Sequence, residues 1–190
     1  MAIHSGRHQF GTDKGRVTLR TYRDGLAAQA GHDLTLEATR WTAELVVSPD
    51  QTPASLVVTV DLGALAVRSG TGGLKPLTDR DKREIGVTAR KVLSADRYPE
   101  ATFSATTFKA DPGGGGTISG TLSLAGQTAP LELRVSSTGP QRYHATATVR
   151  QTDFGIKPYT GFFGALRVRD TVDVEVDADL ADAADQESAA

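Results

Sequence analysis

The sequence contains no cysteine, which excludes disulfide bridges, thiolate metal ligands and thiol nucleophiles together. It also has no surplus of basic residues: 21 lysines and arginines stand against 23 aspartates and glutamates, a formal net charge of -2. This balance argues against a nucleic-acid partner, because nucleic-acid-binding domains carry a basic patch. No stretch approaches the roughly 20 apolar residues of a membrane-spanning helix, and the first thirty residues lack a signal-peptide core. We therefore expect a soluble, cytoplasmic protein.

The histidines and acids form no group suited to catalysis. His4 and His8 are four residues apart, but no acidic third ligand lies nearby, and a metal site needs three or four ligands. His32 adjoins Asp33 without a nucleophile, and the pair is interpreted as a hydrogen bond at a turn or strand edge. No nucleophile elbow, zinc motif, phosphate loop or dinucleotide fingerprint is present. We expect no enzymatic activity, no metal and no cofactor.

What the chain does have is alternation of apolar and polar residues with period two. It is clearest near the C-terminus, where Val172, Val174, Val176, Ala178 and Leu180 alternate with polar residues. Such alternation predicts a strand with one wet and one dry face. Further strands are predicted over residues 17–21, 32–37, 41–47, 56–62, 101–108, 118–124, 131–135 and 143–149. Many strands separated by short turns favour a sandwich or a barrel over parallel βαβ units.

One helix is predicted, from about Asp79 to Leu93. Thr78 is a suitable N-cap, and Asp81 is placed to complete a capping box. Ile85, Ala89, Val92 and Leu93 then share one face at helical spacing. The acids of its first turns, including Asp79 and Glu84, are interpreted as a solvated face. We expect this helix to pack across one end of the β-structure.

The expected inward faces leave two interpretations open, a packed core and a ligand cavity. Small residues on these faces leave room inside: Ala43, Ala105, Gly120, Ala145 and Ala147. A barrel of about eight strands is either filled by side chains or holds one small ligand. Large neighbours such as Trp41, Phe103 and Tyr143 are candidates to fill the same space.

The segment Asp153–Leu166 favours the cavity. Its apolar residues surround three glycines: Phe154, Ile156, Tyr159, Phe162, Phe163 and Leu166. Aromatic side chains beside conformationally permissive glycines can form a mobile mouth over an apolar site, or close the end of a barrel.

Four motifs resemble those of the YceI-like polyisoprenoid-binding proteins, in the same order and at the same spacing. They are Tyr98–Phe103 (YPEATF), the hairpin Ser119–Leu131, Thr152–Ile156 (TDFGI) and the closing strand Val168–Leu180. The likeness extends from about residue 15 to residue 180. The stretch Tyr22–Gly31 differs from the commoner N-terminal hairpin of that family.

The resemblance implies a fold class and a domain plan. The fold would be all-β, a lipocalin-like antiparallel up-and-down β-barrel of about eight strands with one short helix at a barrel end. This domain would occupy residues 15–180, after a flexible N-terminus of residues 1–14 and before a disordered acidic tail of residues 181–190.

The resemblance also implies a function, which is non-catalytic binding, storage or transport of a long-chain isoprenoid lipid in an apolar channel. A polyprenyl chain or an isoprenoid quinone would be the bound ligand. We expect the channel and its mouth to be lined by Trp41, Val58, Val60, Phe103, Leu122, Leu133, Tyr143, Ala145, Ala147, Phe154, Ile156, Tyr159 and Phe162.

Two other functions stay open. The domain could act in stress response through protein interactions at its surface, or it could carry another amphiphile such as a fatty-acyl compound. Transient contact with a membrane and a homodimer are the further partners considered.

Overall fold

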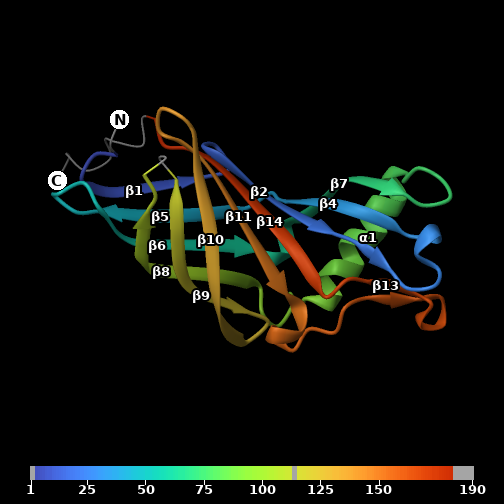
Figure 1. Cartoon of the computed structure of the whole chain (residues 1–190). Helices are drawn as coiled ribbons and strands as arrows, with labels where there is room; N and C mark the ends of the chain where they lie inside the picture. The colour runs from blue at the N-terminus through green and yellow to red at the C-terminus, as the bar shows by residue number, and fades with distance from the viewer. Residues whose placement is uncertain (1–2, 113–114, 182–190) are drawn as a thin grey trace.

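The chain folds around one large curled sheet (Figure 1), seen in a computed structural model that describes residues 3–112 and 115–181. Every pair of neighbouring strands in this sheet is antiparallel. Its eleven strands are, from edge to edge, β1 (Gly6–Gly11), β5 (Trp41–Val47), β6 (Pro53–Asp61), β8 (Glu100–Ala110), β9 (Gly116–Leu124), β10 (Gln127–Gly139), β11 (Arg142–Arg150), β14 (Thr171–Asp179), β2 (Gly15–Thr21), β4 (His32–Ala38) and β7 (Leu65–Gly72).

The sheet does not close on itself. Over the described residues β1 pairs only with β5, and β7 pairs only with β4, so these two strands are its edges. The sheet is a strongly curled half-barrel of eleven strands. The predicted closed barrel of about eight strands is therefore wrong, whereas the β-rich class with antiparallel pairing and one helix is confirmed.

Two strands of the large sheet, β1 and β7, were not predicted from the sequence because their alternation is weak. β1 carries the buried polar residue His8 on its inner face, and β7 changes after Val67 to the sequence RSGTG. The simple up-and-down order is also wrong, because β1 pairs with β5 instead of β2, and β4 pairs with β7 instead of β5. Residues 6–11, assigned from the sequence to a flexible N-terminus, form β1. Of the tail predicted over 181–190, residues 182–190 lie outside the described residues.

The helix α1 (Asp79–Val92) confirms the predicted helix and its cap. The backbone N–H of Asp81 donates to Oγ1 of Thr78 at 3.2 Å, and the backbone N–H of Thr78 donates to Oδ2 of Asp81 at 2.8 Å. Both bonds of a capping box are thus present. The hydrogen bonds from the backbone and hydroxyl of Thr78 lower the pKa of the Asp81 carboxyl. The helix lies beside the edge strand β7 (Figure 1).

A small second sheet stands at the same end of the molecule as β7 and α1. It consists of β12 (Thr160–Gly161), β13 (Leu166–Val168) and β3 (Arg23–Asp24). The short 3₁₀ turns η1 (Ala28–Ala30) and η4 (Phe162–Gly164) adjoin it, and η2 (Leu62–Ala64) and η3 (Gln151–Phe154) follow β6 and β11. The N-H of Ala27 donates to the carbonyl of Ala165 at 2.9 Å and ties these segments together.

The end of the sheet that carries the chain termini is solidly packed. Leu45, Val47 and Leu180 form one cluster there, joined by Phe10 and Tyr143. A second cluster contains Ala43 and Trp41, whose ring meets that of Phe10 edge-on at a centroid distance of 6.1 Å. The two aromatic rings and their neighbours pack against one another on this part of the concave face.

Candidate functional site

The other end of the curled sheet encloses a cavity of about 740 Å³. A volume of this size lies within the usual range for small-molecule sites, roughly 300–1,000 Å³. Its walls are aliphatic side chains from the concave faces of β2, β4, β6, β8, β9, β10, β11 and β14, closed on one side by α1. The helix contributes Ile85, Ala89, Val92 and Leu93, the same stripe that the sequence places on one face.

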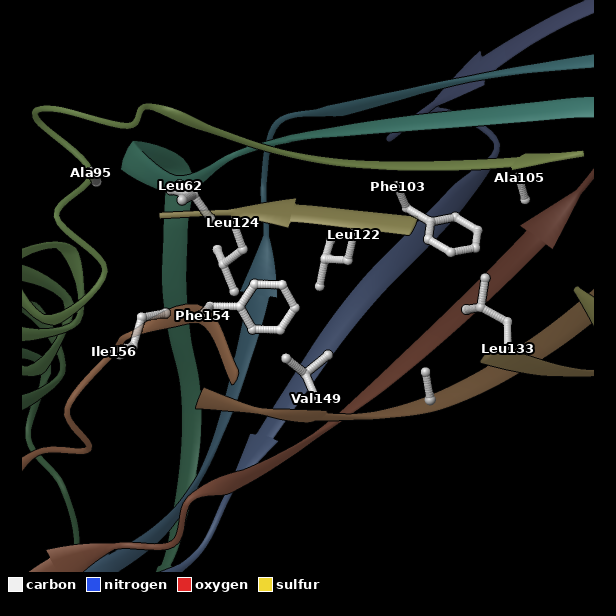
Figure 2. Packing of buried hydrophobic residues seen from close by; sticks show 11 residues of the cluster. Leu62, Ala95, Phe103, Ala105, Leu122, Leu124, Leu133, Val149, Phe154 and Ile156 are labelled. Carbon is white, nitrogen blue, oxygen red and sulfur yellow. The ribbon is translucent and has the colours of Figure 1, made fainter. Parts of the chain in front are cut away.

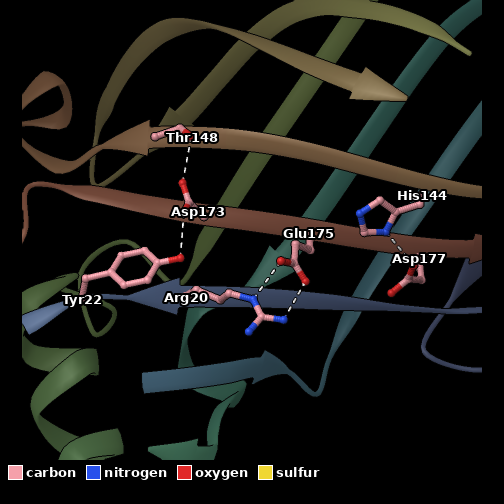
Figure 3. A network of polar contacts seen from close by, with 7 residues as sticks. All are labelled: Arg20, Tyr22, His144, Thr148, Asp173, Glu175 and Asp177. Carbon is pink, nitrogen blue, oxygen red and sulfur yellow. Dashed lines mark hydrogen bonds and ion pairs between the residues drawn. The ribbon is translucent and has the colours of Figure 1, made fainter. Parts of the chain in front are cut away.

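The period-two alternation makes the wall apolar and the outside polar. On β14, Val172, Val174 and Val176 line the cavity, while Asp173, Glu175 and Asp177 point away from it. Figure 3 shows these three acids on the outer face with partners from the neighbouring strands. The chemistry available to a ligand inside is therefore apolar contact.

The outer acids are engaged in cross-strand pairs. Glu175 accepts two hydrogen bonds from the Arg20 guanidinium, at 2.8 and 3.1 Å, and Asp177 lies 2.8 Å from Nδ1 of His144. Asp173 accepts from the hydroxyl of Tyr22 at 2.9 Å, which raises the pKa of that phenol above its ordinary value. These exposed pairs join β2, β11 and β14, and they lie on the opposite side of the sheet from the cavity.

The cavity ends at a definite level along the strands. On β8, Phe103 lines it, but Ala105, two residues further along the same face, does not. On β11 the same boundary falls between Ala147 and Ala145, and on β9 between Leu122 and Gly120. Figure 2 shows Phe103 between Leu122 and Ala105. Phe103 is 6% exposed and forms part of the floor of the cavity.

The space that the sequence predicts beside Gly120, on the inner face of β9, is filled. A Cβ atom at this position would lie 2.7 Å from Cζ of Phe103 and 2.4 Å from the backbone oxygen of Ser104. The missing side chain is thus taken up by the Phe103 ring and by close approach of β8. Of the five small residues expected to leave room, only Ala147 lines the cavity, and Ala43, Ala105, Gly120 and Ala145 lie in packed regions.

Nine of the predicted site residues line the cavity: Val58, Val60, Phe103, Leu122, Leu133, Ala147, Ile156, Tyr159 and Phe162. Four others do not line it. Trp41 and Phe154 are buried in packed clusters, Tyr143 belongs to the cluster near the chain termini, and Ala145 packs beside the core. These four residues lie on or near the concave face but outside the stretch of the strands that surrounds the cavity.

Several lining residues were missed by the sequence analysis. They include the stripe of α1, the inner face of β14 and the inner faces of β2 and β4, where Val17, Leu19, Leu34 and Leu36 lie. The alternation had placed these strand residues inside, and the helical stripe had been interpreted as simple packing. Which inner residues meet the cavity depends on the level along each strand, a property that alternation does not encode.

The cavity lining also includes polar side chains, namely Thr21, Arg23, His32, Lys75, Asp81, Glu84, Thr88, Gln151 and Arg167. His32 approaches the carbonyl of Lys75 with Nε2 at 2.9 Å, and Arg23 donates from Nη1 to the carbonyl of Gly31 at 2.8 Å. Asp33 accepts from the backbone N–H of Arg23 at 2.8 Å, so His32 and Asp33 face different partners. Their geometry is that of loop anchoring, in keeping with the interpretation from the sequence.

Two further properties of the described residues bear on the site. Among residues 3–112 and 115–181, no three histidine or acidic side chains come close enough together to hold a metal ion. In the same part of the chain, no helix combines the length and the apolar character needed to cross a membrane.

A strongly curled antiparallel sheet around an apolar cavity defines the class of this β-protein. The chain belongs to the YceI-like domain family, which matches residues 12–180. UPF0312 proteins of Pseudomonas savastanoi and Pseudomonas syringae are 27% identical to it over 89 residues. That match covers 42% of this chain and 46% of each relative, less than half of their length.

Solved structures share the fold. BcnA of Burkholderia cenocepacia superposes with a TM-score of 0.58 at 16% identity, over 86% of this chain and 94% of that one. The YceI protein of Campylobacter jejuni superposes with a TM-score of 0.55 at 16% identity, over 75% of this chain and 81% of that one. At this level of identity the likeness concerns the fold.

Proposed function

We propose that the protein binds, stores or transports a long-chain isoprenoid lipid in its cavity and catalyses no reaction. The observation that carries the proposal is the cavity of about 740 Å³ whose walls are mainly aliphatic side chains. Membership in the YceI-like family, whose members are generally non-catalytic binding proteins, supports it.

The energetics of such a site suit a branched hydrocarbon tail. Each buried methylene group contributes about 0.8 kcal/mol, so affinity grows with the length of tail inside. Valine and leucine side chains dominate the walls, and they match the methyl branches of an isoprenoid by shape alone. Polar lining groups such as Arg23 and Lys75 would meet the head group of the ligand.

Protein purified from its host without detergent should carry an isoprenoid lipid. Organic extraction followed by mass spectrometry would identify it, and native mass spectra would show its stoichiometry. Adding the extracted lipid to stripped protein at about 100 times its Kd should stabilise the fold by about 2.7 kcal/mol. The proposal would be contradicted if native mass spectra showed only ligand-free protein and if added polyprenols caused no shift in melting temperature. Recovery of fatty-acyl lipids alone would favour the other carrier function.

Ligand uptake should survive loss of the polar rim residues that most resemble an acid and a base. His32→Ala and Glu84→Ala are expected to leave tail binding nearly unchanged, because neither residue belongs to the apolar wall that supplies the affinity. Titration with a polyprenol and a thermal melt on each variant would measure this. Chemical conversion of the lipid by the wild-type protein, lost in either folded variant, would overturn the non-enzymatic assignment.

A further inference from the structure

The mouth of the cavity gathers most of the exposed large hydrophobic side chains. Seven such residues are exposed in the described part of the chain, and two of them, Val57 and Val87, lie on β6 and α1. The other five stand on the loops around the mouth: Leu26, Leu74, Tyr159, Phe162 and Phe163. Leu26 is 100% exposed, Leu74 83% and Phe163 112%. Solvent-exposed apolar groups concentrated in one place mark an interaction surface.

These residues come from three segments that we call the rim loops, residues 25–31, 73–77 and 157–169. All three contribute to the lining of the cavity, through Gly31, Leu77 and Leu166 among others. The hydrogen bond from Ala27 to Ala165 joins the first to the third, and the contact between His32 and Lys75 fastens the second beside them. In Figure 1 the loop after β7 and the region of β13 lie at the end of the molecule away from the chain termini.

The rim loops carry positive charge only. They contain Lys75, Lys157, Arg167 and Arg169 and no aspartate or glutamate, although acids outnumber bases over the whole chain. All four of these side chains belong to exposed residues. Arg23 and Asp24, directly before the first loop, offset one another. The three rim loops are therefore positive and apolar on a protein of net charge -2, while Asp81 and Glu84 of the neighbouring helix α1 also line the cavity.

The backbone at the tip of the third loop is held in an uncommon form. Phe162 and Phe163 have φ values of 48° and 54°, in the left-handed region, followed by Gly164 at 88°. Bulky residues rarely adopt this conformation because Cβ crowds the neighbouring carbonyl oxygen. Two successive phenylalanines in it, one of them wholly exposed, indicate a tip whose rings are directed outward for contact with another surface.

We propose that the rim loops dock onto an anionic lipid bilayer, with Leu26, Leu74, Phe162 and Phe163 inserted into its interfacial layer. Aromatic and leucine side chains beside lysine and arginine, without acids, are the chemistry of interfacial membrane binding. Because the same loops line the cavity mouth, docking places that mouth against the lipid. This inference goes beyond the proposed function, and it holds whichever apolar ligand fills the cavity.

Sedimentation with lipid vesicles tests the proposal on the full chain. Vesicles of equal parts phosphatidylglycerol and phosphatidylcholine should bind the wild-type protein. Vesicles of phosphatidylcholine alone should bind it at least about tenfold more weakly, because each cation near an anionic surface contributes about fivefold in affinity. The double variant Leu74→Ser with Phe163→Ser, two exposed rim residues that do not line the cavity, should lose about tenfold or more in affinity for the anionic vesicles. Its matched control, Val57→Ser with Val87→Ser, removes exposed hydrophobic groups elsewhere and should bind as the wild type does.

A second pair of variants isolates the charge. Lys157→Gln with Arg169→Gln should weaken binding to the anionic vesicles about 25-fold, fivefold for each cation, whereas Lys91→Gln with Lys109→Gln, away from the rim, should not. Nile red fluorescence in vesicle-free solution reports the cavity separately and should be the same in all variants. Wild-type protein left in the supernatant with both kinds of vesicle would overturn the proposal, as would control pairs that lose as much binding as the rim pairs. A wild-type dimer that becomes monomeric in the Leu74→Ser with Phe163→Ser variant would instead assign the rim to a second copy of the chain and overturn the proposal.

Discussion

Ala147→Trp is expected to abolish ligand uptake while the free energy of unfolding stays close to that of the wild-type protein. Ala147 lies on the inner face of β11, opposite Val174 of β14, and lines the cavity. An indole ring at this position projects into unfilled space, where it takes the volume that a lipid tail needs. Urea denaturation and a polyprenol titration on the same variant measure the two effects separately.

Ala105→Trp is the matched control for this experiment. Ala105 also faces inward, but it is 4% exposed and lies beyond the floor of the cavity, paired with Leu56 and Gly120. A ring forced into this packed region should lower the free energy of unfolding by about 1–3 kcal/mol or more. Equal destabilisation of both variants would mean that the space beside Ala147 is filled. Unchanged ligand binding in Ala147→Trp would place the ligand elsewhere.

Phe103→Ala should lower the free energy of unfolding of the ligand-free protein by about 3–5 kcal/mol, the usual loss for removing a buried aromatic ring. Phe103 contacts the packed end through the close approach of Gly120, and its other side faces the cavity. Removing the ring also removes part of the floor. The preferred ligand should therefore become longer, because the added depth accepts further isoprene units.

Binding measured across polyprenols of increasing length, with Phe103→Leu as the control, tests this role of Phe103. Leucine retains a large branched side chain at the floor, so both the loss of stability and the shift in preferred length should be smaller. A length preference that stays the same in Phe103→Ala would mean that another residue ends the channel.

Local features of the fold, which depend only on residues close together in the sequence, could be predicted from the sequence. The alternation in Val172, Val174 and Val176 correctly predicts β14 and its dry face, because the side chains of a strand alternate whatever its neighbours are. Thr78 and Asp81 correctly predict where α1 begins, because a capping box is local. Motif order supplied the family.

The features that could not be predicted, such as the edge strand β1 and the level of the cavity along the strands, depend on pairing between distant parts of the sequence. β1 was missed because its inner face carries the buried histidine His8, whose Nε2 lies 2.7 Å from the carbonyl oxygen of His4. Ala145 and Ala147 share one face of β11, yet only the second reaches the cavity. Alternation gives the face of a residue, but its distance from the packed end follows from the register of the whole sheet.

The open edge at β7 has a consequence for what the cavity can hold. In a closed barrel the number and stagger of the strands determine the diameter, so a wider occupant must strain the hydrogen-bonded ladder. Here the ladder ends at β7, and α1 completes the enclosure through side-chain contacts alone. We therefore expect a thicker occupant to displace the helix outward and leave every strand pair intact. The depth of the cavity would then be fixed by its floor, whereas its diameter would adjust to the bound ligand.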